Sequence, residues 1–299
     1  MPGLRKAVIL AAGLGTRLVP YSKEMPKEML PVFQRENGDT VLKPIIQVIF
    51  EQLYEAGVRE FCFVVGRAKR AIEDHFTPDW DYIELLRRRG KDFQARLLEE
   101  FYRKVEESYI LWANQSKPLG TGHAVYMARG FVGGDPFYAA ASDNLYLGEN
   151  VAARLGELWG RYARPLLTVK RVDDPRKYGV VVAEPLGERL YRALRIVEKP
   201  GEPVSHLANT SLYVFPPEIF RAIEETPLSP RGEIEITASI QLLLDRGVEF
   251  LAYEPEAPWV DAGTWDTYLA AVFYSLRLSV DQGKLGELAD ILSQGGGAG

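Results

Sequence analysis

Cysteine and histidine are scarce in this chain of 299 residues, and their scarcity excludes several kinds of site. A single cysteine, Cys62, allows neither an internal disulfide nor a cysteine metal cluster. It lies in an apolar run at residues 61–65, where a buried structural thiol is expected rather than a nucleophile. The histidines are far apart in sequence and lack the spacing of a metal site; they are His75, His123 and His206.

Long apolar runs and an excess of positive charge are also missing. No stretch approaches the roughly 20 apolar residues that a membrane-spanning helix needs, and no apolar signal-peptide core precedes Arg5 and Lys6. The net charge of −5 disfavours a protein that mainly binds nucleic acid. We therefore expect a cytoplasmic protein without a membrane or nucleic-acid partner. Asparagine and glutamine are few and arginine outnumbers lysine, as in some thermophilic proteins.

Short apolar runs alternate with helical patterns through the first half of the chain. Strands at 7–12 and 61–65 flank a helix at 44–55, and a short helix follows at 68–76. This βαβ rhythm predicts an α/β fold: a Rossmann-like, mixed but mostly parallel sheet flanked by helices, with ligands at the carboxyl ends of the strands. Further strands are predicted at 109–112, 137–141, 166–171, 180–183, 194–197, 211–215 and 250–253, and further helices at 84–107 (one or two), 234–246 and 264–278.

The first strand ends in a glycine turn, Gly13 and Gly15, which is followed by Arg17 and Lys27. Glycines let backbone N–H groups approach a phosphate or a base that a β-carbon would obstruct. Two cations just beyond the turn suit a polyphosphate. The turn is not a Walker A loop, and Leu18 stands where a dinucleotide-binding loop has its third glycine. The segment therefore points to another kind of nucleotide chemistry.

Two aspartates, Asp143 and Asp261, each follow an apolar segment that reads as a strand. Carboxylates at strand ends suit Mg²⁺, which takes one or two carboxylates together with phosphate oxygens and water. Each aspartate alone could equally form a turn or cap a helix. Sequence spacing does not place the two together.

The glycine turn, extended by Thr16, Arg17, Leu18 and Pro20 and then by 26–27 (Pro-Lys), resembles the G-x-G-T-R-L/M-x-P … P-K signature of the sugar-1-phosphate nucleotidyltransferases. The order of motifs is similar to that family over residues 6–276. The resemblance implies the nucleotide-diphospho-sugar transferase architecture for residues 1–278, followed by a C-terminal helix and flexible tail at 279–299. It implies a reaction in which an NTP and a sugar 1-phosphate give an NDP-sugar and pyrophosphate.

The same resemblance implies a role for each residue of the site. The catalytic residues are Arg17, Lys27, Asp143 and Lys199, and the ligands of a Mg²⁺ cofactor are Asp143 and Asp261. The nucleotide-binding residues are Leu10, Ala11, Ala12, Gly13, Gly15, Thr16, Gln115 and Gly120. The sugar-binding residues are Gly179, Glu198, Lys199 and Thr210. Arg17 and Lys27 would hold the departing pyrophosphate, and Lys199 the sugar phosphate.

Residues 23–31 and the charged insert before Gln115 are closest to the bacterial UTP–glucose-1-phosphate uridylyltransferase branch, with UTP and glucose 1-phosphate as substrates. Three departures leave dTTP and a thymidylyltransferase open: Ser211 replaces a usual glycine, Ala238 replaces a common aspartate, and 261–264 are nearer the thymidylyltransferase form. The motifs are also compatible with a catalytically inactive NDP-sugar-binding regulator and with a metal-dependent glycosyltransferase. The resemblance implies a homodimer or homotetramer. Helices at 264–278 and 285–292 could supply its contact surface, although packing on the chain's own core explains their leucines equally well.

Overall fold

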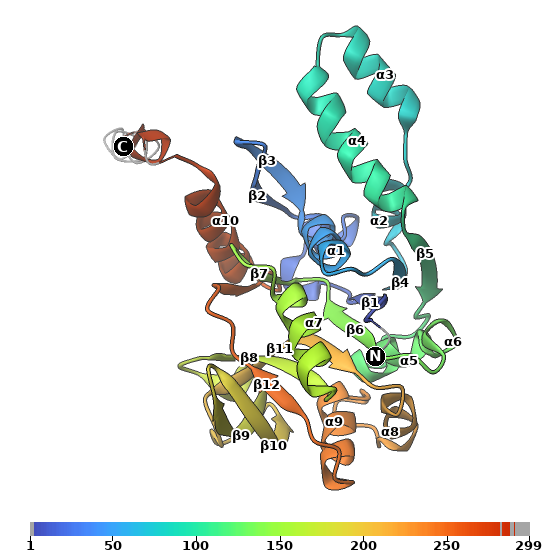
Figure 1. Cartoon of the computed structure of the whole chain (residues 1–299), viewed down its shortest axis with the longest axis vertical. Coiled ribbons are helices and arrows are strands. Elements are labelled where there is room, and N and C mark those ends of the chain that lie inside the picture. The colour runs from blue at the N-terminus through green and yellow to red at the C-terminus, as the bar shows by residue number, and fades with distance from the viewer. Residues whose placement is uncertain (1–2, 282, 288–289, 291–299) are drawn as a thin grey trace.

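A nine-stranded mixed sheet runs through the middle of the molecule (Figure 1), and helices flank it. The computed structural model describes residues 3–281, 283–287 and 290. The strands lie in the order β5 (Tyr109–Asn114), β4 (Glu60–Val65), β1 (Lys6–Ala11), β6 (Phe137–Ala141), β11 (Leu207–Phe215), β8 (Leu166–Arg171), β12 (Leu251–Tyr253), β10 (Leu190–Glu198) and β9 (Gly179–Gly187). This architecture confirms the predicted fold class.

The strands from the first half of the chain are parallel to one another, as the βαβ alternation predicted. β4 pairs in parallel with β1 and β5, and β1 pairs in parallel with β6. Strand β1 is an unbroken apolar run because it is covered on both faces: Ile9 and Ala11 pack in one core cluster, and Val8 packs in the other. The second half is mixed, since β8 is parallel to β12 whereas β11, β10 and β9 pair antiparallel with their neighbours.

Most of the helices predicted from the sequence are present in the structure. The predicted helices correspond to α1 (Ile45–Glu55), α2 (Arg70–His75), α3 (Trp80–Arg88), α4 (Asp92–Glu106), α9 (Ile236–Asp245) and α10 (Trp265–Ser279). The charged segment at 84–107 is a pair of antiparallel helices, α3 and α4, that stands away from the sheet (Figure 1). Within the described residues, no helix has both the length and the apolarity needed to cross a bilayer.

Several elements escaped the sequence prediction. They are the hairpin β2 (Pro31–Glu36) and β3 (Asp39–Pro44), the helices α5 (Thr121–Met127), α6 (Arg129–Val132), α7 (Val151–Tyr162) and α8 (Ile219–Glu225), and the two-stranded sheet β7 (Asn144–Tyr146) with β13 (Trp259–Asp261). The hairpin turns at Asn37 and Gly38, both with positive φ, so the Asn-Gly pair was a readable signal. The predicted flexible tail lies mostly outside the described residues.

A buried ion pair ties the loop after β1 to the start of α2. Glu28 has no exposed surface, and its Oε2 accepts a 2.7 Å hydrogen bond from Nζ of Lys69, itself buried. Burial raises the pKa of Glu28, and the charge of Lys69 opposes that rise. Because neither charge has water as an alternative partner, each depends on the other.

Glu28→Gln should destabilise the protein by about 3–5 kcal/mol, because it leaves the Lys69 ammonium buried without a counter-charge. Urea unfolding at neutral pH measures this change. Glu84→Gln is the matched control: Glu84 pairs with Arg88 on the exposed surface of α3, where removing the charge should cost about 0.5 kcal/mol or less. Equal stability of the two variants would contradict the dependence of Lys69 on Glu28.

Candidate active site

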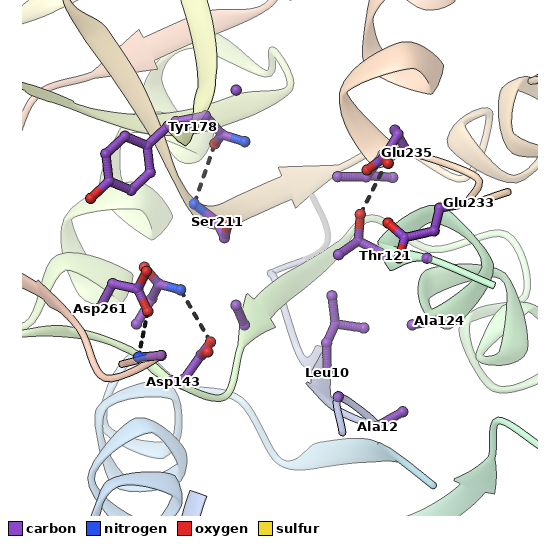
Figure 2. A pocket seen from close by; sticks show the side chains of 18 of the residues that line it. Leu10, Ala12, Thr121, Ala124, Asp143, Tyr178, Ser211, Glu233, Glu235 and Asp261 are labelled. Atoms are coloured by element: carbon purple, nitrogen blue, oxygen red, sulfur yellow. Dashed lines mark hydrogen bonds between the residues drawn. The ribbon is translucent and has the colours of Figure 1, made fainter. Parts of the chain in front are cut away.

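A pocket of about 510 Å³ opens where the carboxyl ends of β1, β6 and β10 meet. The structure brings most of the predicted site residues to its wall: Leu10, Ala12, Gly13, Gly15, Thr16, Arg17, Lys27, Gln115, Gly120, Asp143, Gly179, Glu198, Lys199 and Asp261. Figure 2 shows Leu10, Ala12 and Ala124 on one side of the pocket, with Asp143, Asp261 and Tyr178 on the other.

Ala11 and Thr210 are the two predicted residues that do not line the pocket. Side chains alternate along a strand, so Leu10 and Ala12 face the pocket whereas the Ala11 side chain is fully buried in the core. The Thr210 hydroxyl is likewise buried and donates to Oγ1 of Thr168 at 2.6 Å. Thr210 therefore does not line the pocket, whereas its neighbours Asn209 and Ser211 do.

Lys27 and Asp143 form an ion pair at the floor of the pocket, although 116 residues separate them in sequence. Both side chains are about nine-tenths covered. Burial is the largest single influence and opposes the charge on each, but the opposite charge and its hydrogen bond together outweigh burial. The pKa of Lys27 is therefore raised and that of Asp143 is lowered, so both groups are charged at neutral pH. A β-carbon at Gly13 would lie 3.8 Å from the Lys27 Nζ, so the ammonium sits directly under the glycine turn.

Asp261 joins this pair because β7 and β13 pair antiparallel, which sets Asp261 opposite Asn144. The backbone N–H of Ala262 donates to the carbonyl of Asp143 at 2.8 Å, and that of Gly263 donates to Oδ1 of Asp261 at 2.8 Å. Burial and then the negative charge of Asp143 raise the pKa of Asp261. The convergence of the two aspartates is thus created by a small sheet that the sequence did not reveal.

Arg17 completes the charged end of the pocket. A β-carbon at Gly263 would lie 2.8 Å from Nη2 of Arg17, so the guanidinium packs against the backbone beside Asp261. Its charge lowers the pKa of Asp261, which partly offsets the repulsion from Asp143. Two cations and two carboxylates therefore share one end of the pocket.

These carboxylates fit a divalent cation such as Mg²⁺. The negative charges of Asp143 and Asp261 repel each other, as the raised pKa of Asp261 indicates. A small hard cation between the two carboxylates would relieve this repulsion, with phosphate oxygens and water as its remaining ligands. Across residues 3–281, 283–287 and 290, no group of three or more His, Cys, Asp or Glu side chains forms a metal site. A metal held here by Asp143 and Asp261 would therefore complete its coordination with water and phosphate oxygens.

The segment that leads to β13 is anchored by Lys170 on β8. Its ammonium donates to three consecutive carbonyls, those of Pro255, Glu256 and Ala257, at 2.7, 3.1 and 2.9 Å. Glu149 accepts the N–H of Ala257 at 3.2 Å. These contacts fix the chain immediately before the strand that presents Asp261.

Gln115 and Gly120 lie at the end of the pocket beyond β1. Gln115 is buried, and its Nε2 donates to the carbonyl of Gly120 at 3.2 Å and lies 3.0 Å from Nδ1 of His123. Gly120 has φ 94°, and a β-carbon there would stand 2.7 Å from the carbonyl oxygen of Ile234. Only glycine fits, so the turn beside Gln115 packs tightly against the segment that leads into α9.

Glu198 and Lys199 lie in another part of the pocket wall. Oε2 of Glu198 accepts from the Thr237 hydroxyl at 3.0 Å, and Oε1 lies 3.4 Å from Nη2 of Arg231. Lys199 has φ 41°, an uncommon value for a residue with a side chain, and its N–H donates to the carbonyl of Tyr178 at 3.0 Å. The backbone thus turns sharply at the residue that carries the ammonium.

Sequence reasoning missed several lining residues. They are Glu28, Lys177, Asn209, Tyr213, Glu235, Thr237 and Trp259. Trp259 donates from Nε1 to Oδ1 of Asn144 at 2.8 Å, and its ring lies edge-on to that of Tyr178 at 5.3 Å. Asn209 could have been found from strand alternation once its strand was placed.

The fold and this arrangement of charges belong to an enzyme class that handles nucleotides. The sequence profile of the Nucleotidyl transferase family matches residues 6–276. The chain therefore belongs to the nucleotidyl transferase family.

Individual relatives are more specific. A UTP–glucose-1-phosphate uridylyltransferase of Bacillus subtilis is 38% identical over 270 residues, which are 88% of each chain. A UTP-bound UGPase from Acinetobacter baumannii is 30% identical with a TM-score of 0.82, over 96% of this chain and 98% of that one. A UDP-glucose pyrophosphorylase complexed with UDP-glucose is 28% identical with a TM-score of 0.80, over 92% and 99%. A putative glucose-1-phosphate thymidylyltransferase from Bacillus anthracis matches less well: 26% identity and a TM-score of 0.68, over 93% and 98%.

Proposed function

We propose that this chain transfers the uridylyl group of UTP to glucose 1-phosphate and releases UDP-glucose and pyrophosphate. The observation that carries the proposal is the cluster of Lys27, Asp143 and Asp261 under a glycine turn, with Glu198 and Lys199 in the wall of the same pocket. The similarity to uridylyltransferases and to UTP- and UDP-glucose-bound structures supports the choice of substrates.

In the proposed reaction a phosphate oxygen of glucose 1-phosphate attacks the α-phosphorus of UTP in line. One P–O bond forms there, and the bond to the β-phosphate oxygen breaks as pyrophosphate leaves. Positioning and charge neutralisation supply the catalysis, since no covalent enzyme intermediate is needed. Lys199 holds the attacking phosphate, and Arg17 and Lys27 stabilise the leaving pyrophosphate.

Asp143 and Asp261 are the proposed ligands of Mg²⁺, which would polarise the α-phosphate oxygens. The two carboxylates would hold the cation at one end of the pocket, and the ammonium of Lys27 would be free to pair with the phosphates. In this proposal Gln115 meets the edge of the base. One amide distinguishes a pyrimidine from a purine edge, but the methyl of thymine lies away from that edge and is worth about 1–3 kcal/mol.

The test is pyrophosphate release with Mg²⁺, in a grid of UTP, dTTP, CTP, ATP and GTP against glucose, galactose, mannose and N-acetylglucosamine 1-phosphates. We expect the maximum at UTP with glucose 1-phosphate. A maximum at dTTP would move the chain to the thymidylyltransferase branch with the same mechanism. Tight UDP-glucose binding with no turnover in any cell of the grid would favour a regulator, and transfer from an NDP-sugar to an acceptor would favour a glycosyltransferase.

Lys27→Met should lower kcat roughly 30- to 1,000-fold, because it removes about 2–4 kcal/mol of electrostatic stabilisation from the transition state. Steady-state kinetics at saturating UTP and Mg²⁺ measure it. Lys23→Met is the control from the same loop: Lys23 is exposed and paired only with its neighbour Glu24, so kcat should stay within about twofold. Turnover of Lys27→Met close to that of Lys23→Met would remove Lys27 from the mechanism.

The proposal includes a homodimer or homotetramer in the cytoplasm. Helix α10 carries exposed apolar side chains four residues apart, Trp265, Leu269 and Phe273, which form one stripe on the face away from β2. Such a stripe in water favours burial against a second copy. The lone, buried thiol of Cys62, whose pKa burial raises to about 12, is consistent with a reducing compartment.

Phe273→Glu should shift the assembly to a smaller species in sedimentation experiments at micromolar concentration, because it places a charge in the apolar stripe. Leu228→Glu, at an equally exposed leucine in a loop, should leave the mass unchanged. A wild-type chain that sediments as a monomer would overturn the proposed assembly.

A further inference from the structure

Ser211 adopts a backbone conformation that is unusual for a residue with a side chain. Its φ of 60° lies in the left-handed region, where glycine is free of strain and other residues are not. It lies inside β11, at a register shift between Asn209 and Tyr213 where the strand slips against β8. Strained residues persist where their surroundings hold them, and such places cluster at functional sites.

Neighbouring polar groups hold Ser211 in place. Its N–H donates to Oδ1 of Asn209 at 3.3 Å, and Nδ2 of Asn209 donates to the hydroxyl of Tyr213 at 2.6 Å. Burial raises the pKa of Tyr213 to about 12, and hydrogen bonds with Asn209 and Ser211 act against that rise. All three residues line the pocket, so the bulge presents the Ser211 side chain to the ligand space.

The pocket wall next to this bulge is closely packed around Gly179. A β-carbon at Gly179 would stand 2.7 Å from Cγ2 of Thr237, 3.1 Å from Oε2 of Glu198 and 3.7 Å from Cβ of Asn209. The absence of a side chain at Gly179 thus allows Thr237, Glu198 and Asn209 to pack close to its backbone. Close-packed walls do not move without strain. The β-carbon and hydroxyl of Ser211 therefore reduce the volume that is available to a sugar in this part of the pocket.

We propose that Ser211 is a specificity-determining residue that narrows the sugar end of the pocket against hexose 1-phosphates whose ring carries a substituent larger than a hydroxyl, such as an acetamido group. The inference rests on the proposed function and deepens it. A clash of this kind discriminates at the level of kcat/KM, since the larger sugar cannot reach the reactive position in the narrowed pocket.

The decisive quantity is the ratio of kcat/KM for N-acetylglucosamine 1-phosphate to that for glucose 1-phosphate, with UTP and Mg²⁺. Ser211→Gly should raise this ratio by about tenfold or more. Ser211→Ala retains the β-carbon and should raise it less; an equal rise in both variants also supports the proposal and assigns the narrowing to the hydroxyl. A ratio for Ser211→Gly within twofold of the wild type overturns the proposal.

Ala163→Gly separates the loss of strain from the gain of space. Ala163 ends α7 in the same left-handed region, with φ 49°, and does not line the pocket. Both glycine variants should raise the midpoint of thermal unfolding by relief of strain, but only Ser211→Gly should change the sugar ratio. A comparable change in the ratio for Ala163→Gly would mean general loosening of the fold and would also overturn the proposal.

Calorimetric binding of UDP-glucose and UDP-N-acetylglucosamine distinguishes this inference from the proposed function, because it needs no turnover. Ser211→Gly should increase the affinity for UDP-N-acetylglucosamine relative to UDP-glucose by a similar factor. A wild type without activity in any substrate pair would refute the proposed reaction, and the binding ratio would still decide the role of Ser211.

Discussion

The charge balance among Lys27, Asp143 and Asp261 is the constraint around which the rest of the site is arranged. Two carboxylates brought together in a largely buried place repel each other, and the ammonium of Lys27 is the nearest charge that offsets this repulsion. The parallel strand β6 delivers Asp143, the small sheet of β7 and β13 delivers Asp261, and the loop after β1 returns Lys27 beneath the glycine turn. Three parts of the chain therefore meet for an electrostatic reason.

The same balance explains why the site suits a polyanion. A ligand that brings phosphates and a divalent cation together offers Lys27 and the two carboxylates new partners of opposite charge at once. The cation alone would meet carboxylates already compensated by Lys27, and the phosphates alone would meet carboxylates of their own sign. The arrangement thus favours the joint binding of metal and nucleotide, which belongs with the proposed uridylyl transfer.

Much of the fold was readable because its signals are local. The apolar run of β1, the helical pattern of α1 and the end of β6 before Asp143 all depend on neighbours in sequence. The Asn37-Gly38 turn is an equally local signal, but the two strands beside it lack the continuous apolar run by which the other strands were predicted. The burial of the Thr210 side chain could not be read from the sequence, because a shift of one residue along a strand turns a side chain to the opposite face.

The meeting of Asp143 with Lys27 and Asp261 could not be read from spacing, because it depends on the pairing of β7 with β13 and on the loop after β1 that carries Lys27. The resemblance to a family supplied that meeting where physical reasoning from the sequence could not. The positive φ of Ser211 was equally hidden, since serine itself gives no signal of a left-handed backbone.

The hydrogen bonds from Lys170 to three consecutive carbonyls affect the mobility of the segment before β13. A strand of three residues such as β13 would ordinarily fray on its own, because it has few backbone bonds to lose. Here the segment before it is fastened to β8, a strand in the interior of the large sheet. The segment before Asp261 is therefore coupled to the central sheet, and we expect the backbone at Asp261 to fluctuate less than that of an untethered three-residue strand.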